Sequence, residues 1–252
     1  MTHLKPPQQN AATAESPSET TTALADDASA IVAIAAHEIK NALGGLSVAL
    51  ARCEQVLASG KLVTKEHIST ARGELRRISA LVNDLLDGSR VDLGVVHIVA
   101  KPIDIGELAR DVVTMFEAAR HRSVHLVLPS ESLVVVADAE RVRSVLINYL
   151  ENAAKYAPAS SDIQVNVEVL PAGAGVRIAV VDQGPGVSVD DQARLFERFY
   201  RSPSVASRAP GLGLGLYVCR SVATAHGGRV GVDSTPGQGA SFWIELPQTP
   251  PP

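Results

Sequence analysis

The sequence has little of several features that would mark particular classes of protein. Only 4% of its 252 residues are aromatic, and its two cysteines, Cys53 and Cys219, lie far apart inside helical patterns. Such cysteines do not indicate a disulfide framework, and a reducing cytosol is the simplest interpretation. The formal net charge of -4 gives no support for a nucleic-acid partner, which would require a basic patch.

Long apolar runs are also missing. No run approaches the ~18–20 residues that a membrane span needs, and the longest, residues 28–36, leads into the charged letters HEIK. The first ten residues lack the apolar segment of a signal peptide. We therefore expect no membrane insertion by this chain and a cytoplasmic location. Hydrophobic residues still make up 46% of the sequence, enough for a packed core.

Composition divides the chain into five segments. Residues 1–25 are rich in Thr, Ser, Ala, Pro and Gln, and we predict a disordered tail because they cannot bury enough surface to offset their ordering entropy. Residues 26–90 carry a helical pattern, 91–101 form a linker, 102–248 have a mixed pattern, and 249–252 are a loose tail. The mixed region predicts helices at 105–120, 139–156 and 211–225 and strands at 124–128, 133–137, 163–170, 176–181, 229–233 and 240–246.

Apolar residues in the helical segment recur alternately every four and three positions, which is a heptad spacing. Ser59 and Gly60 supply a stop between two such helices, and Thr64 can cap the second. A helical hairpin alone leaves half of each seam exposed, so we predict a homodimer in which two hairpins form a four-helix bundle. The seam residues are Val32, Ala36, Ile39, Leu43, Leu46, Leu50, Cys53 and Leu57 in the first helix and Ile68, Ala71, Leu75, Ile78, Val82 and Leu85 in the second.

The segment HEIKNAL is the first candidate for chemistry. His37 lies just off the seam, so packing does not require it, and a neutral imidazole is a usable nucleophile near pH 7. Glu38 can accept the other ring proton or orient the ring, and Asn41 lies one turn further on the same face. The alternative is a surface histidine on a charged helix.

A second candidate is NYLENAAKY. Helical spacing puts Asn148, Asn152, Lys155 and Tyr156 on one face, which is a poor core stripe. Carboxamide oxygens suit Mg²⁺ and a lysine suits phosphate. The alternative is an ordinary solvated face.

Two glycine-rich motifs follow. In VVDQGPGV a strand ends in Asp182, whose carboxylate can accept a hydrogen bond from an adenine amino group; the alternative is an Asp-Gly turn. In GLGLGLYV three alternating glycines precede a helix, where backbone N–H groups favour phosphate. That spacing fits neither a Walker P-loop nor GxGxxG. The irregular, partly basic segment LFERFYRSPS between the two motifs indicates a mobile lid over a nucleotide.

Taken together and in this order, the motifs resemble those of the sensor histidine kinases of two-component signalling. HEIKNAL is similar to their H-box, NYLENAAKY to the N-box, DQGPG to the G1 box, ERFYR to the F-box and GLGLGL to the G2 box. Each motif is unspecific alone, but five in the order of the family, spread over residues 27–247, are specific.

The resemblance implies an α+β chain. A helical hairpin forms a dimeric four-helix bundle, and an α/β sandwich then binds ATP in the manner of the gyrase, Hsp90 and histidine kinase (GHKL) ATPases. By position, His37 accepts the γ-phosphoryl group with Glu38 as base, and a receiver domain of a response regulator takes it on an aspartate. Asn41, in an H-E-x-x-N pattern, implies a phosphatase of that regulator.

For the nucleotide, the resemblance implies that Asn148 and Asn152 hold Mg²⁺, that Lys155 approaches the phosphates and that Tyr156 packs on ATP. Asp182 would read adenine. Backbone approach to the ligand is assigned to Gly184, Gly186, Gly211, Gly213 and Gly215.

The sequence also departs from the family. Ala42 stands where many members have proline, which puts a helix kink in doubt. There is no recognisable sensor domain, so we expect that the signal comes from a separate input protein or from the N-terminal tail, or that the chain is a fragment. Two rival functions are a non-catalytic ATP-binding scaffold or phosphotransfer adaptor, and a serine kinase or anti-sigma switch on the same fold. The intact nucleotide motifs argue against the scaffold, and the hairpin that carries His37 argues against the serine kinase.

Overall fold

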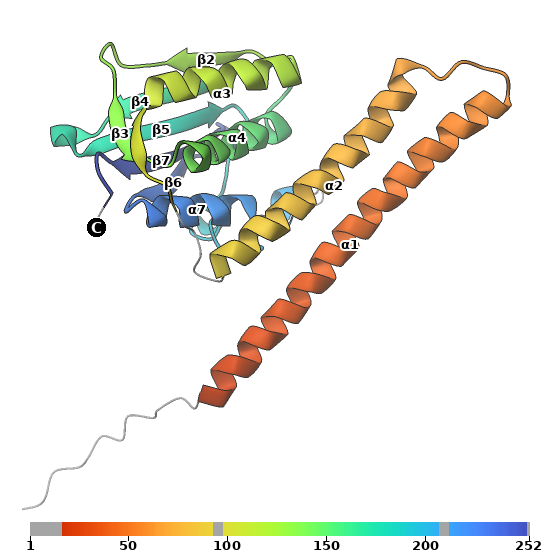
Figure 1. The fold of residues 1–252 in the computed structure, drawn as a ribbon, viewed down its shortest axis with the longest axis horizontal. Helices are drawn as coiled ribbons and strands as arrows, with labels where there is room; N and C mark the ends of the chain where they lie inside the picture. Colours follow the sequence, from red (N-terminus) through yellow and green to blue (C-terminus); the bar gives the residue numbers. More distant parts are fainter. Residues whose placement is uncertain (1–16, 93–97, 207–211, 251–252) are drawn as a thin grey trace, which may run out of the picture.

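The computed structural model describes residues 17–92, 98–206 and 212–250, which form a long helical hairpin and an α/β domain beside it (Figure 1). Helix α1 (Pro17–Ala58) and helix α2 (Lys65–Asp92) make the hairpin. Gly60, with φ of +72°, turns the chain after α1, and the Lys61 N–H donates to the Val56 carbonyl at 3.1 Å. The loop that the sequence predicts is therefore a glycine-terminated helix end.

Helix α1 begins earlier than predicted. It starts at Pro17, inside the predicted tail of residues 1–25, while residues 1–16 lie outside the described part of the chain. Proline is well suited to the first helical position, and the alanine-rich stretch that follows has high helix propensity. The helix continues through Ala42 without interruption, so the alanine found there keeps the helix straight through the motif.

The heptad seam separates into two rows in the single chain. Cys53 of the predicted seam is buried inside the hairpin together with Ala71 of α2, and so is Ala49, which the predicted seam did not include. A second row, spaced by seven residues, is open: Leu43 and Leu50 are each 49% exposed. Half of the seam is therefore buried within the hairpin and half is left without cover.

The α/β domain has a five-stranded mixed sheet in the order β2-β4-β5-β7-β6, with β2 parallel to β4 and the remaining pairs antiparallel. Its strands are β2 (Val124–Val127), β4 (Ile163–Val169), β5 (Gly175–Asp182), β6 (Arg229–Ser234) and β7 (Ala240–Pro247). Helices α3 (Ile105–Arg120), α4 (Ala139–Tyr156) and α7 (Gly215–Ala225) lie on one side of the sheet (Figure 1). This is the predicted sandwich.

Aspartates at two helix starts fix where the helices begin. The Asp104 carboxylate accepts from the Glu107 N–H at 3.0 Å ahead of α3, and Asp138 accepts from two N–H groups of the first turn of α4. The second oxygen of Asp138 accepts from the Val99 N–H at 2.8 Å, and its own N–H donates to His226 Nε2 at 2.9 Å. Asp138 thus joins the start of α4, the end of α7 and the chain that arrives from the hairpin.

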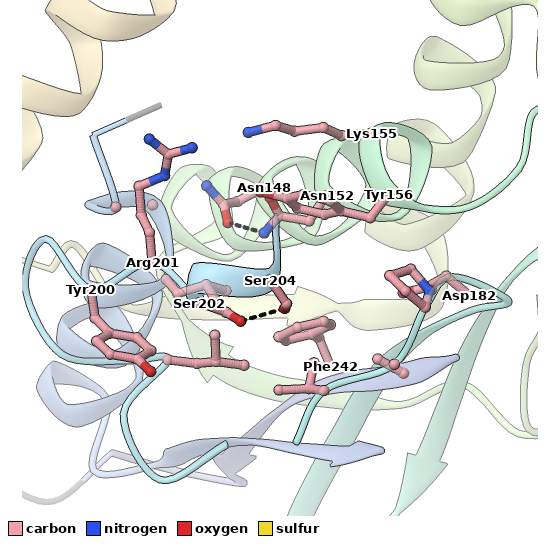
Figure 2. A pocket seen from close by; sticks show the side chains of 18 of the residues that line it. Asn148, Asn152, Lys155, Tyr156, Asp182, Tyr200, Arg201, Ser202, Ser204 and Phe242 are labelled. Atoms are coloured by element: carbon pink, nitrogen blue, oxygen red, sulfur yellow. Dashed lines mark hydrogen bonds between the residues drawn. The ribbon is translucent and has the colours of Figure 1, made fainter. Parts of the chain in front are cut away.

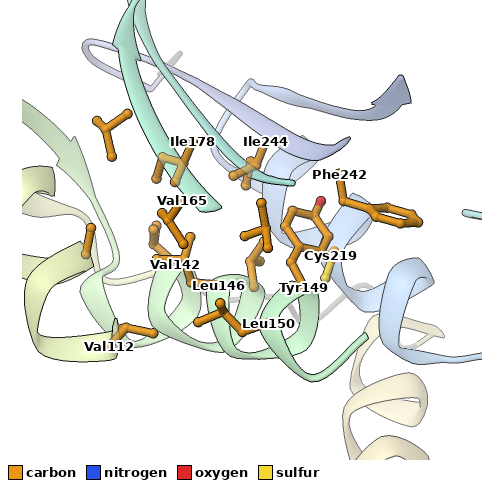
Figure 3. Close-up of a cluster of buried hydrophobic side chains, with 14 of the residues drawn as sticks. Val112, Val142, Leu146, Tyr149, Leu150, Val165, Ile178, Cys219, Phe242 and Ile244 are labelled. Atoms are coloured by element: carbon orange, nitrogen blue, oxygen red, sulfur yellow. The ribbon is translucent and has the colours of Figure 1, made fainter. Parts of the chain in front are cut away.

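The core of the domain lies between α4 and the sheet. Val142, Leu146 and Leu150 of α4 belong to one buried cluster with Ile178 and Ile244 of the sheet (Figure 3). Tyr149 is fully buried beside them, and its hydroxyl donates to the Trp243 carbonyl at 3.2 Å. One face of α4 is therefore committed to the core, which leaves the other for a site.

The structure adds three elements that the pattern did not predict: strand β1 (Lys101–Asp104), and helices α5 (Val189–Gln192) and α6 (Pro203–Ala206). β1 pairs with β3 (Val134–Ala137), and a 3-10 turn, η1 (Pro171–Gly173), joins β4 to β5. Helix α2 extends into the predicted linker of residues 91–101, and α7 starts at Gly215, four residues later than predicted. The remaining predicted elements are present within two residues.

The two regions meet at a small apolar cluster. Ala42 of α1 is fully buried against Leu212 and Leu214, which precede α7, and Ile39, Ile78, Phe199 and Tyr217 pack around them. No helix in the described part of the chain combines the length and the apolar character of a membrane span.

Candidate active site

One face of α4 forms a wall of a cleft that opens to solvent (Figure 2). Asn148, Asn152, Lys155 and Tyr156 all line it, as their helical spacing predicts. The Asn152 amide Nδ2 donates to Asn148 Oδ1 at 3.2 Å, so the two carboxamides are adjacent. The polar face of α4 is therefore a site wall rather than an ordinary solvated face.

Asp182 lies at the end of β5 and also lines the cleft. It is 6% exposed, and its Oδ1 accepts from the Gly184 N–H at 2.7 Å. Burial raises the pKa of the Asp182 carboxyl, although the N–H groups of Gly184 and Ala240 and the charge of Arg122 act in the opposite direction. The result is a carboxylate in a low-dielectric position that still has an oxygen to offer a ligand.

Gly184 is not among the residues that line the cleft, and its role in ligand approach stays a prediction. A Cβ at this position would lie 2.7 Å from Asp182 Oδ1 and 3.4 Å from the Tyr156 carbonyl oxygen. The glycine is needed because its amide must come close behind Asp182. Its part in the site is to hold the carboxylate.

Gly186 does line the cleft, and it has φ of +70°. A side chain there would collide with the Thr235 carbonyl in the turn between β6 and β7. The same turn holds the loop that carries Gly186, because the Gly237 N–H donates to the Pro185 carbonyl at 2.7 Å. The predicted G1 loop is thus fixed to the last strand pair.

Two of the three alternating glycines line the cleft, Gly213 just before α7 and Gly215 as its first residue, and Gly211 lies outside the described residues. Gly213 has φ of +71° and lies against the backbone of Phe199. The Phe199 N–H donates to the Gly213 carbonyl at 3.0 Å. A Cβ on Gly215 would collide with the carboxamide of Asn148. These glycines allow α7 to start directly against α4.

The predicted acceptor residues lie on α1. His37 and Glu38 are within the helix, and their side chains lie outside the described part of the structure. Asn41 is exposed, while the next residue, Ala42, is buried against the α/β domain. Asn41 is not among the residues that line the cleft.

Sequence reasoning missed several residues of the cleft. Tyr200, Arg201, Ser202 and Ser204 line it from the predicted lid, and Phe242 lines it from β7 (Figure 2). The lid segment was recognised as a unit, but it has no periodicity from which individual side chains could be chosen. Phe242 is one of the buried residues that alternate along β7 with Ser241 and Trp243, and nothing in that pattern distinguishes a cleft residue from a core residue.

The adjacent carboxamides fit a magnesium ion. Mg²⁺ prefers oxygen ligands and keeps several waters, so one or two protein oxygens with substrate phosphates are sufficient. Asn148 Oδ1 is engaged by Asn152 Nδ2, which leaves the Asn152 carbonyl oxygen pointing elsewhere. The glycine at position 215 provides the space that the Asn148 carboxamide occupies.

Both regions of the chain match family models. Residues 28–94 match the His Kinase A (phospho-acceptor) domain, and residues 137–250 match the histidine kinase-, DNA gyrase B- and HSP90-like ATPase. The chain belongs to the sensor histidine kinases of two-component systems, with the acceptor domain ahead of the ATPase domain. The resemblance drawn from the five motifs is thereby confirmed.

Individual relatives agree. The sensor protein KdpD of Escherichia coli is 31% identical over 219 residues, covering 87% of this chain and 24% of the relative. The adaptive-response sensory kinase SasA of Synechocystis is 29% identical over 225 residues, 86% of this chain and 58% of the relative. The chain thus spans about a quarter to three fifths of the length of these relatives.

Solved structures show the same architecture. Full-length ShkA in complex with AMPPNP superposes with a TM-score of 0.62 at 27% identity, covering 88% of this chain and 46% of that one. ThkA in complex with the response regulator protein TrrA has a TM-score of 0.65 at 23% identity, covering 92% and 64%. The second likeness shows the shared fold.

Proposed function

We propose that this chain is an ATP-dependent protein histidine kinase that phosphorylates His37 and passes the phosphoryl group to an aspartate in the receiver domain of a response regulator. The observation that carries the proposal is the convergence of the α4 face, Asp182 and the start of α7 on one cleft. The cleft belongs to a chain whose first helix presents a histidine in a matched phospho-acceptor domain. ThkA, a similar fold, has been solved with a response regulator.

The cleft has two chemically different ends, which fit the two ends of ATP. Asp182 and Phe242 both line the cleft, which suits an adenine base that donates its amino group and stacks on a ring. Lys155, Arg201 and the start of the eleven-residue helix α7 offer positive charge and backbone N–H groups to the phosphates. The base would therefore sit at Asp182 and the phosphates at the Lys155 end.

Magnesium would be held by Asn148 and Asn152, and when bound it supplies charge neutralisation on the phosphate oxygens. Asn152 is the better placed ligand because the Asn148 oxygen already accepts its amide. Lys155 and Arg201 add positive charge to the same end of the cleft.

In the transfer step, a ring nitrogen of His37 attacks the γ-phosphorus of ATP. The N–P bond forms, the bond to the bridging oxygen of ADP breaks, and Glu38 accepts the proton from the other ring nitrogen. A carboxylate oxygen of the receiver aspartate then attacks the same phosphorus: the O–P bond forms, the N–P bond of the phosphohistidine breaks, and His37 takes back the proton that Glu38 accepted and returns to its neutral form. The docked arrangement of Ala42 against Leu214 brings the ATPase domain to the helix that carries His37.

Incubation of the full chain with γ-labelled ATP tests the proposal. We expect label that is lost in acid and survives alkali, as for phosphohistidine, and its complete loss in His37→Gln. The matched control is His67→Gln, a second histidine of the hairpin, which should label normally. Acid-stable label would support a serine kinase, and absence of label with intact ATP binding would support the scaffold function.

A phosphatase activity toward the same regulator is a second proposal, and the exposure of Asn41 favours it. Asn41 lies four residues after His37 and faces solvent, where a docked receiver domain would meet it. Its carboxamide could then orient the water that attacks the phosphoaspartate. Loss of such positioning commonly costs ~10²-fold in rate.

For this activity the test is the decay of a prephosphorylated regulator freed of ATP. Asn41→Ala should slow it while leaving autophosphorylation nearly intact, and Ser47→Ala, an exposed residue of the same helix, should do neither. Equal decay with the wild type and Asn41→Ala would leave Asn41 as a surface residue. We further propose that the protein acts in the cytoplasm as a homodimer.

A further inference from the structure

Asp191 is hydrogen-bonded to two residues that line the cleft, Tyr200 and Ser202, and has no part in the proposed chemistry. It belongs to the short helix α5, and its backbone N–H is held by the Ser188 hydroxyl at 3.2 Å. Its side chain turns away from α5 toward a segment that lies nine to eleven residues later in the chain.

Both oxygens of this carboxylate are used. The Tyr200 hydroxyl donates to Oδ1 at 2.5 Å, and the Ser202 hydroxyl donates to Oδ2 at 2.7 Å. Ser202 is 5% exposed, so this contact is sheltered from water, and its oxygen lies 2.7 Å from that of Ser204. Hydrogen bonds to an ionised carboxylate are stronger than those between neutral groups.

The pKa shifts of Asp191 and Tyr200 agree with these hydrogen bonds. Hydrogen bonds from Tyr200, then Ser202 and Ser188, lower the pKa of Asp191. The same hydrogen bond to Asp191 is the main cause that raises the pKa of Tyr200. At neutral pH a charged acceptor therefore faces two hydroxyl donors.

The residue between the two donors is Arg201. With Tyr200 and Ser202 both bonded to Asp191, the side chain of Arg201 leaves the backbone in another direction. Figure 2 shows it reaching toward the end of the cleft that holds Asn148 and Lys155, while Tyr200 lies on the far side. One carboxylate thus fixes the two neighbours of a cationic residue of the cleft.

The chain is also held at Phe199, the residue just before Tyr200. The Phe199 N–H donates to the Gly213 carbonyl at 3.0 Å, and Phe199 itself has φ of +60°. Positive φ is unfavourable for a residue with a side chain, and it persists only where surrounding contacts impose it. Asp191 supplies two of the contacts that hold the residues immediately after Phe199.

We propose that Asp191 is a positioning residue for the phosphate end of the nucleotide: by holding Tyr200 and Ser202 it presents Arg201 to the terminal phosphates. This inference rests on the proposed ATP site. An arginine that is already placed loses less side-chain freedom when the phosphate binds, so the bound state is favoured. A role in folding alone would weaken every ligand of the cleft to the same degree.

The experiment compares equilibrium binding of Mg-AMPPNP and of adenosine to the full chain. Asp191→Ala should weaken AMPPNP binding by about tenfold, in the range of an unplaced long side chain, and leave adenosine binding within about twofold. The matched control is Asp190→Ala, which removes the same charge from an exposed position of α5. It should leave both affinities unchanged.

A double-mutant cycle tests the link to Arg201. If Asp191 acts through Arg201, then Arg201→Ala alone and Arg201→Ala with Asp191→Ala should bind AMPPNP equally, within about twofold. Losses that multiply, or an equal loss for adenosine and AMPPNP, would overturn the proposal.

Asp191→Asn keeps the size of the side chain and one acceptor oxygen, so it covers the case in which the alanine variant does not fold. Its loss of AMPPNP affinity should be intermediate, and an unchanged affinity would contradict the proposal. If the wild type itself binds no AMPPNP, the proposed function fails, whereas normal wild-type binding with insensitive Asp191 variants removes only this inference.

Discussion

The hairpin and the α/β domain treat their apolar residues differently. In the α/β domain the large apolar side chains of α4 and the central strands are almost completely buried, with Leu146, Ile178 and Ile244 each at 0% exposure. In the hairpin Leu43, Leu50 and Leu57 are about half exposed or more. One region completes its core within a single chain, and the other does not.

Apart from Val48 and Leu62, the exposed large apolar residues of the hairpin are regularly spaced. They recur every seven positions on α1, and Ile68, Leu75 and Val82 do the same on α2. Single exposed apolar residues are ordinary, but aligned rows on two neighbouring helices form an apolar face. A second hairpin placed against this face would bury both rows, which is the four-helix bundle that the heptad spacing predicts.

Replacing leucines of these rows with charged residues should produce the largest effect, and the quantity affected is the dissociation constant of the dimer. Leu43→Glu with Leu50→Glu introduces four carboxylates into the interface of a dimer and removes four leucines. At roughly 1 kcal/mol or more per half-buried leucine, we expect the dissociation constant to rise by at least about 10³-fold. Analytical ultracentrifugation would report a monomer at micromolar concentration.

The matched control for the dimer face is Val48→Glu. Val48 is exposed but lies off both rows, so this variant should remain dimeric. Melting of the α/β domain should be unchanged in all of these proteins, because its core receives nothing from the rows. A dimeric double variant would place the interface elsewhere.

The α/β domain, which completes its core within one chain, is tested by a substitution in α4. Leu146→Ala removes a fully buried side chain from the centre of the α/β core and should lower the free energy of unfolding of that domain by about 2–5 kcal/mol. Denaturant unfolding followed by the single tryptophan, Trp243, measures it, since this residue lies on β7 of the same sheet.

Ile147 provides the comparison residue, because it is adjacent in sequence and partly exposed. Ile147→Ala should cost much less than Leu146→Ala, and both variants should keep the dimer. Loss of dimerisation in Leu146→Ala would mean that the two regions do not have separate cores.

The sequence predicts the helices and strands that pack on a core better than it predicts the contacts between irregular segments. Where a helix or strand has one face in a core, periodicity locates it. The spacing of Asn148, Asn152 and Lys155 correctly predicts a shared polar face because the intervening residues are committed to packing. Asp182 is equally readable, since it ends an apolar strand.

Periodicity fails where contacts join irregular segments. Asp191 and Tyr200 are brought together by turns whose geometry no local pattern encodes. Gly184 looks like its neighbours in the motif, yet its amide serves Asp182 behind the cleft. The contact of Ala42 with Leu214 depends on how two regions dock, and neither sequence segment carries information about the other.

The smallest expected effect concerns pH and belongs to the α/β domain alone. Because burial raises the pKa of Asp182 above its ordinary value of 3.8, this carboxylate takes up a proton at a higher pH than an exposed aspartate does. Only the ionised form accepts freely from an adenine amino group. ATP affinity should therefore fall by about tenfold as the pH drops through the raised pKa, which corresponds to one charge-assisted hydrogen bond.

The stability of the ligand-free domain should respond with the opposite sign. A carboxyl whose pKa is higher in the folded state than in the unfolded state contributes stability below the unfolded pKa, and that contribution is lost as the pH rises through the folded pKa. Acid thus favours the empty fold at Asp182 while it disfavours the nucleotide complex.

Calorimetric titration with ADP and melting without nucleotide, both compared with Asp182→Asn at each pH, separate these two effects because the titration of ADP itself cancels in the comparison. Asp182→Asn should bind more weakly and lose both dependences, whereas Asp190→Asn should retain them. A wild type whose ADP affinity follows the same pH curve as Asp182→Asn would show that this carboxylate does not contact the base, and the adenine end of the cleft would have to be sought elsewhere.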